Sequence, residues 1–175
     1  MYIQKVVIEN IRSIAHFEME FPKPAGWHVL IGDNGAGKSS IVRAMAAVLT
    51  GPDQIVAVLP VWEEWIAKGK DTGNITLEVM PDWSHDRIGR GQPPKGKTII
   101  NKFHFSRNSR GVLLSTNAND EKLPPTNYNW GNNEGWFSVA YGPFRRFTGG
   151  DNKRDKVFFS APKAGAHLSV FGEDI

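Results

Sequence analysis

The sequence predicts an α/β fold, and three observations lead to that expectation. Residues 2–9 are rich in β-branched side chains, and residues 17–21 alternate Phe or Met with Glu, so both stretches indicate strands of an antiparallel pair. The short apolar run 28–31 indicates a third, buried strand. The Ala-rich stretch 40–49 has helical spacing and ends before Gly51, a residue type common at helix C-termini. A strand, a glycine-rich loop and a helix are therefore expected in succession.

The composition bounds the class of protein. A chain of 175 residues suits one domain, and 40% hydrophobic with 22% charged residues is ordinary for a globular protein. The net charge of +3 is too small to indicate nucleic acid by itself. There are no cysteines, which excludes disulfides and cysteine-based sites. No run approaches the roughly 20 apolar residues that cross a bilayer, and residues 1–5 do not open a signal peptide. We expect a cytoplasmic protein without a membrane partner.

Further elements are expected beyond the helix. Trp62, Trp65 and Ile66 would share one face of a short helix, and two later stretches alternate apolar and polar residues as half-buried strands do. The expected elements are, in order, a helix over 61–68, a strand over 74–80, a polar loop over 81–97, a strand over 98–106, an irregular excursion over 115–135 and a buried strand over 135–141.

The glycine-rich loop carries the chemistry. Residues 32–39 fit the pattern G-x-x-x-x-G-K-[ST] between the expected strand and the expected helix. Its glycines let successive N–H groups point inward, and the helix N-terminus adds the positive end of its dipole. Lys38 would reach the β- and γ-phosphates, and the Ser39 hydroxyl would hold Mg²⁺. We predict that this loop binds a nucleoside triphosphate.

The pattern extends into a resemblance. Residues 8–13, followed by a strand and then by residues 31–40, resemble the opening of ABC-type ATPase heads of the SMC, RecF and OLD group within the AAA-family ATPases. Residues 140–146 and 166–171 are similar to those of bacterial members, including ATPases of Septu-type anti-phage systems and some retrons. The resemblance touches both ends of the chain and leaves residues 52–135 uncovered.

This resemblance implies a P-loop NTPase fold, namely an ABC/SMC-like head lobe with an N-terminal antiparallel β pair and a β-rich, loop-rich insertion. The lobe would comprise residues 1–51 with the strands, loop and helix, residues 52–135 as the insertion, and residues 136–175 as a core strand and Q-loop-like segment. Arg12 and Ser13 would approach the nucleotide. The residues that would wrap the triphosphate are Asn34, Gly35, Ala36, Gly37, Lys38, Ser39 and Ser40. An arginine there either pairs with a phosphate, stacks on adenine or is an ordinary solvated turn residue.

The same resemblance implies ATP and Mg²⁺ as cofactors and an ATP-dependent homodimer of heads in the full-length protein. That dimer would control a DNA-directed activity, in anti-phage defence or DNA repair, with a nuclease as a possible partner and DNA as a possible ligand. These expectations concern the complete protein.

Elements needed for hydrolysis are not found in the sequence. Arg145 and Arg146 stand where ABC-type heads have a Q-loop, but no glutamine accompanies them. Residues 147–151 look like the ABC signature, yet no acidic residue ends the strand that follows them. No catalytic residue or Walker B strand emerges, and His167 draws interest through the resemblance alone. We therefore expect the N-terminal part of a larger ATPase that hydrolyses little or no ATP by itself.

Two other classes stay open. A small self-contained P-loop kinase or phosphotransferase would need a catalytic acid, and the N-terminal hairpin argues against it. A non-hydrolysing nucleotide-sensing interaction module could use Trp83, Trp130 and Trp136 as a partner surface. Steady ATP turnover would favour an enzyme, whereas tight binding without turnover would favour a sensor.

Overall fold

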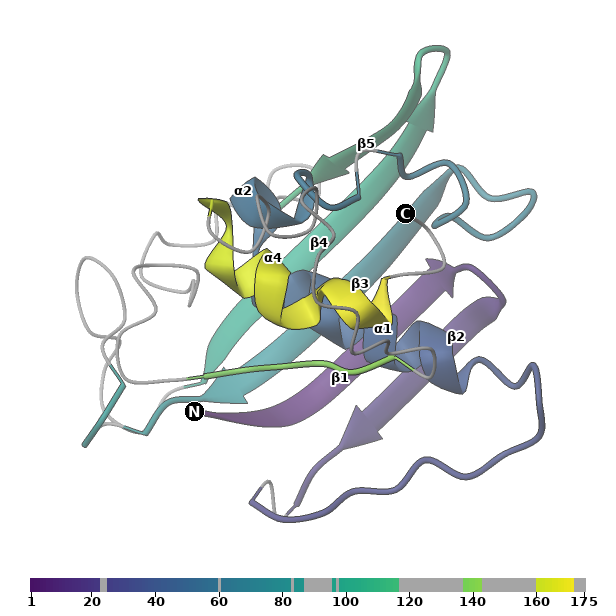
Figure 1. The fold of residues 1–175 in the computed structure, drawn as a ribbon. Coiled ribbons are helices and arrows are strands. Elements are labelled where there is room, and N and C mark those ends of the chain that lie inside the picture. Colours follow the sequence, from purple (N-terminus) through teal and green to yellow (C-terminus); the bar gives the residue numbers. More distant parts are fainter. Residues whose placement is uncertain are drawn as a thin grey trace.

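The computed structural model describes most of the chain, in the ranges 1–22, 25–59, 61–82, 84–86, 96, 98–116, 137–142 and 160–171. Five strands of these residues form one antiparallel sheet (Figure 1). The strands are β1 (Tyr2–Ile11), β2 (Ile14–Glu20), β3 (Thr72–Met80), β4 (Ile99–Asn108) and β5 (Gly111–Ser115). Their order across the sheet is β2-β1-β3-β4-β5, so β1 pairs with its hairpin partner β2 and with the distant β3.

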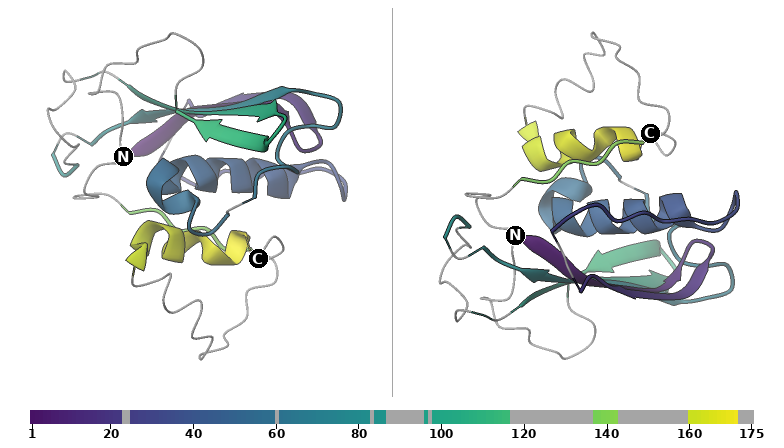
Figure 2. Two further views of the ribbon diagram at one scale, coloured as in Figure 1. Left: turned by 90° about the horizontal axis from the view of Figure 1, so that it is seen from above. Right: turned by 90° about the horizontal axis from the view of Figure 1, so that it is seen from below.

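Helices cover one face of this sheet in two layers. They are α1 (Lys38–Thr50), α2 (Pro52–Ile55), α4 (Pro162–His167) and the 3-10 helix η2 (Leu168–Val170). Figure 2 shows α1 in the middle, with the sheet on one side and α4 on the other. Accordingly, α1 contacts β1, β3 and β4 on one face and α4 and η2 on the other. No helix in the described part of the chain is long and apolar enough to cross a membrane.

The strand patterns predicted from the sequence decide which face of the sheet is buried. Ile75 and Leu77 of β3, with Phe103 and Phe105 of β4, are fully buried, while their neighbours along each strand are half-buried polar residues. Burying one such side chain stabilises the fold by about 1.5–3 kcal/mol. The strands predicted over residues 2–9, 17–21, 74–80 and 98–106 are confirmed, and so is the α/β fold class with an antiparallel pair at its N-terminus.

Small side chains allow α1 to be packed on both faces. Ala44 and Ala47 are fully buried, so the sheet and the C-terminal layer approach the helix closely. Arg43 is the exception in size and is only 4% exposed. Its Nε donates a hydrogen bond of 2.8 Å to the carbonyl of Val170, which ties α1 to η2.

The helix predicted over residues 61–68 is wrong. Residues 63–65 form a turn, and Ile66 makes a single antiparallel bridge to Ile11. The burial predicted for Trp62, Trp65 and Ile66 is nevertheless correct. The helix does not form because its main-chain groups bond elsewhere: the carbonyl of Trp65 accepts from Arg12 N–H at 2.8 Å, and Ala67 N–H donates to the carbonyl of Asn10.

The buried strand predicted over residues 28–31 is also wrong. These residues have no regular secondary structure, and Val29 and Ile31 are 77% and 92% exposed. His28 packs edge-on against Phe21 with ring centroids 4.7 Å apart, and Leu30 packs partly against the core. A strand needs a neighbour with free main-chain groups; β1 is already paired on both sides, and residues 28–31 pair with neither edge strand, β2 or β5.

Two further differences concern the second half of the chain. Strand β5 was not predicted, because its five residues are too few to show a period. The strand predicted over 135–141 is wrong in its described part: residues 137–142 have no regular structure, and Phe137 is exposed. Ala140 alone of these packs partly against the core, with its N–H donated to the carbonyl of Ala166.

We predict that Val29→Lys and Ile31→Lys leave stability nearly unchanged, within about 0.5 kcal/mol, because both side chains are exposed. Leu77→Ala, in the core, should cost about 2–5 kcal/mol. Urea unfolding of the three variants measures both effects. A loss at Val29 as large as that at Leu77 would show that residues 28–31 form a buried strand in solution.

Candidate nucleotide-binding site

The glycine-rich loop leads directly into α1. Gly35 and Gly37 have φ of 85° and 88°, a left-handed conformation that glycine adopts at little cost. Gly37 is the N-cap of α1, and the first helical hydrogen bond runs from Ile41 N–H to its carbonyl at 2.9 Å. The two glycines therefore set the direction in which the chain enters the helix.

The N-terminus of α1 is electrostatically prepared for an anion. It has no side-chain cap and no acidic residue in its first turn. The N–H groups of Lys38, Ser39 and Ser40 precede the first i→i−4 bond, so the helix itself supplies them no acceptor. The helix dipole adds partial positive charge at the same place. Gly32 to Ala36, with Asn34 and Gly35 between them, are exposed, so an anion can reach these donors.

Lys38 reaches back over the loop that precedes it. Its Nζ donates hydrogen bonds of 2.6 Å to the carbonyls of Gly32 and of Asp33. The ammonium is thus held at the loop by two neutral acceptors. A phosphate oxygen entering the loop would compete for the same ammonium, and a charge-assisted bond is stronger than a neutral one.

The β1–β2 turn lies against this loop. A Cβ placed on Gly37 would lie 3.2 Å from Ile14 Cγ1 and 3.6 Å from Ser13 Oγ. Asn10 and Arg12 both have φ of 52°, which is uncommon for residues with a side chain. The conformation is held because Arg12 N–H donates to Trp65 and the Asn10 carbonyl accepts from Ala67 N–H at 2.9 Å. The structure therefore brings the predicted residue Ser13 beside the predicted loop, with Arg12 next to it in the same turn.

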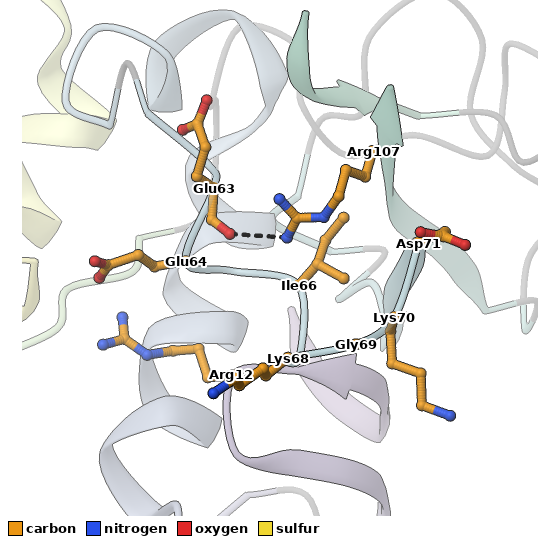
Figure 3. A pocket seen from close by; sticks show the side chains of 9 residues that line it. All are labelled: Arg12, Glu63, Glu64, Ile66, Lys68, Gly69, Lys70, Asp71 and Arg107. Carbon is orange, nitrogen blue, oxygen red and sulfur yellow. Dashed lines mark hydrogen bonds between the residues drawn. The ribbon is translucent and has the colours of Figure 1, made fainter. Parts of the chain in front are cut away.

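An open cavity of about 630 Å³ lies beside that turn, with Arg12 in its lining (Figure 3). Charged side chains of both signs surround it, with four cations against three carboxylates. They come from the β1–β2 turn, from the end of β4 and from the 63–71 segment that connects α2 to β3. The lining residues are Arg12, Glu63, Glu64, Ile66, Lys68, Gly69, Lys70, Asp71 and Arg107.

Sequence reasoning identified Arg12 and missed the rest of this cavity. The 63–71 segment was interpreted in part as a helix, which hid the turn at Gly69, a residue with φ of 77°. The Lys-Gly-Lys tripeptide there was the available signal for an exposed basic turn.

Other predicted positions fall elsewhere. Arg145, Arg146 and the signature-like stretch 147–151 lie outside the described residues. Within the described ranges, no group of three or more His, Asp or Glu side chains could hold a metal ion.

His167 is a buried residue of the C-terminal layer. It is 1% exposed, and its Nδ1 donates a hydrogen bond of 2.6 Å to the carbonyl of Lys163. Its Nε2 is buried and has no hydrogen-bond partner in the described part of the chain. Burial, joined by the charge of Lys163, lowers the pKa of His167, so the folded state favours the neutral ring.

We predict that stability falls as pH drops below the ordinary histidine pKa of about 6.5. Because the pKa of His167 is lowered on folding, the unfolded chain binds more protons between the folded and the unfolded pKa. The stability is therefore full above the unfolded pKa and is lost as the pH falls through the folded pKa. His104 adds in the same direction, since burial also lowers its pKa. Chemical unfolding at several pH values should show a shallower dependence for His167→Asn than for wild type. The exposed residue His16 provides the control: His16→Asn should keep the wild-type slope, and equal slopes for wild type and His167→Asn would contradict the assignment.

Comparison with known proteins gives a consistent family. A family model described as an AAA domain matches residues 5–111, from β1 through the loop and the cavity to the start of β5. The Septu protein PtuA of Bacillus mycoides (strain KBAB4) is 36% identical over 85 residues, which are 45% of this chain and 12% of that protein.

Similarity also extends to Rad50. The DNA double-strand break repair Rad50 ATPase of Thermoplasma volcanium is 28% identical over 120 residues, which are 69% of this chain and 12% of that protein. The Rad50 ATPase of Methanopyrus kandleri is 45% identical over 47 residues, 27% of this chain and 5% of that protein. A solved structure from work on the ATP-driven dimerization and DNA-stimulated activation of SMC ATPases has a TM-score of 0.46 and 20% identity, over 66% of this chain and 70% of that one. The aligned region is a small part, at most 12%, of these curated relatives.

Proposed function

Since the chain belongs to the AAA-domain family whose model matches its residues 5–111, within the SMC- and Rad50-like ATPases, we propose that it binds ATP together with Mg²⁺. The observation that carries the proposal is the uncapped N-terminus of α1, which directly follows an exposed glycine-rich loop. The Lys38 ammonium is hydrogen-bonded to two carbonyls of that loop. Backbone donors, helix dipole and ammonium converge there on one exposed place, as a triphosphate requires.

Each part of the nucleotide has a counterpart in this arrangement. The triphosphate would lie on the loop from Asn34 to Ser40, with Lys38 exchanging its carbonyl partners for phosphate oxygens. The Ser39 hydroxyl is exposed in the first turn and would hold Mg²⁺. The nucleoside would extend past the β1–β2 turn toward the cavity, because Arg12 and Ser13 join the cavity to the loop.

The activity of the whole protein is a further part of this proposal. ATP would join two such heads in a homodimer and so control a DNA-directed activity in the cytoplasm. Rad50 relatives named for DNA double-strand break repair support that direction, and similarity to a Septu protein supports a role in anti-phage defence. A nuclease partner is proposed from the resemblance in the sequence alone. Because no catalytic residue or Walker B strand emerges from the sequence, the 175-residue chain is proposed to bind ATP without sustained turnover.

We predict that Lys38→Ala weakens Mg·ATP binding by about ten- to a hundredfold, because a charge-assisted bond to phosphate is lost. Lys102→Ala removes the same charge from the opposite face of the sheet, where Lys102 pairs with Thr76, and should bind like wild type. Calorimetric titration measures affinity, and release of inorganic phosphate measures turnover. Equal binding by wild type and Lys38→Ala would refute the proposal, and robust turnover by wild type would refute binding without hydrolysis.

We also predict that Ser39→Ala removes most of the gain in ATP affinity that Mg²⁺ gives the wild type. The hydroxyl is the proposed protein ligand of the ion, so binding in the presence of a chelator should be the same for both proteins. Titration with and without Mg²⁺ tests this. The same dependence on Mg²⁺ in both proteins would remove Ser39 from the metal site.

A further inference from the structure

Arg107, at the end of β4, fastens both ends of the cavity-lining segment. Its backbone N–H donates to the carbonyl of Asp71 at 2.8 Å, and its Nη2 donates to the carbonyl of Glu63 at 3.1 Å. Figure 3 shows the guanidinium group directed across the cavity to Glu63, with Asp71 beside the strand. One exposed residue therefore fixes the 63–71 segment at its start and at its end.

The other contacts of this segment strengthen the same attachment. Trp62 and Trp65 pack on Phe105 of β4, with ring centroids 5.3 Å and 5.8 Å apart. At the start of β5, Gly111 has φ of 127°, and a Cβ there would lie 2.9 Å from Glu63 Oε1. The β4–β5 hairpin thus packs closely against this part of the chain, and Gly111 leaves room for the Glu63 side chain.

The segment in turn holds the β1–β2 turn. Trp65 accepts from Arg12 N–H, Ala67 donates to Asn10, and Ile66 bridges to Ile11. These contacts keep two residues with side chains at a φ of 52°. Contacts therefore run without a break from Arg107 through the segment and the turn to Gly37 of the phosphate loop.

We propose that Arg107 is a positioning residue for the nucleoside end of the bound nucleotide, an inference that rests on the ATP binding proposed above. Arg107 acts on the cavity wall and the turn, and the hydrogen bonds that it donates in the described part of the chain go to Asp71 and Glu63, not to the phosphate loop. The phosphate donors of α1 are fixed instead by the packing of that helix on both faces. Loss of Arg107 should therefore affect the nucleoside part of the affinity and spare the phosphate part.

Inorganic tripolyphosphate separates the two parts, because it offers the phosphates without the nucleoside. In the 175-residue chain, Arg107→Ala should weaken Mg·ATP binding by about tenfold, as expected when a charged hydrogen bond that holds the site is removed. Its affinity for Mg·tripolyphosphate should equal that of wild type. Arg107→Lys keeps the charge and the backbone bond and should give an intermediate ATP affinity.

Arg110→Ala is the matched control, since it removes the same charge from the nearby β4–β5 turn. It should bind both ligands like wild type. Three results would overturn the inference: Arg107→Ala loses equal affinity for ATP and for tripolyphosphate, Arg107→Ala loses affinity for neither, or Arg110→Ala loses as much affinity for ATP as Arg107→Ala does. If Arg107→Ala unfolds, Arg107→Lys decides: a wild-type ratio of the two affinities overturns the inference, and a lowered preference for ATP supports it. Failure of wild type to bind either ligand would instead refute the proposed function itself.

Discussion

The structure depends on one constraint: α1 is held on two faces while its N-terminal N–H groups point to solvent. Fully buried alanines, Ala44 and Ala47 among them, let the sheet and the C-terminal layer close on the helix. The first N–H groups of any helix have no acceptor within the helix, so those of α1 stay available to a ligand while the packing holds the helix in place. The preceding loop has to turn away without covering them, and the left-handed Gly35 and Gly37 make that path possible. The anion site is therefore a consequence of how the core is packed.

The sheet contributes a second part of the proposed site, the strained β1–β2 turn. A residue with a side chain in the left-handed region costs on the order of 1–3 kcal/mol, and the turn contains two, Asn10 and Arg12. Main-chain bonds from the 63–71 segment offset that cost and keep the turn against Gly37. A Cβ on Gly73 of β3 would lie 2.8 Å from the Asn10 carbonyl, so β3 also has to approach closely. The turn is thus positioned by residues that are distant in sequence.

These origins explain what the sequence could and could not predict. Helix α1 is local in sequence, and the long strands show their buried face through a period of two, so both were predicted correctly. Residues 28–31 are apolar, but the sequence does not say whether a strand lies beside them, and they pair with none of the described strands. The tryptophan spacing of residues 61–68 suits a helix as well as a turn, and bonds to Asn10 and Arg12 decide between them. The cavity combines three separate segments, so no short pattern could reveal it.

The same connectivity bears on what a bound nucleotide would do. The Lys38 ammonium donates hydrogen bonds to two loop carbonyls. Phosphate binding would therefore exchange these neutral acceptors for charged ones, with the ammonium already at the loop. A nucleotide that spans the loop and the cavity would touch α1 at one end and the wall fastened by Arg107 at the other. Its binding energy would then add to the contacts that already join α1, the β1–β2 turn and the end of β4. On this proposal, a bound nucleotide would therefore link the phosphate loop to the end of β4, which is distant from that loop in sequence.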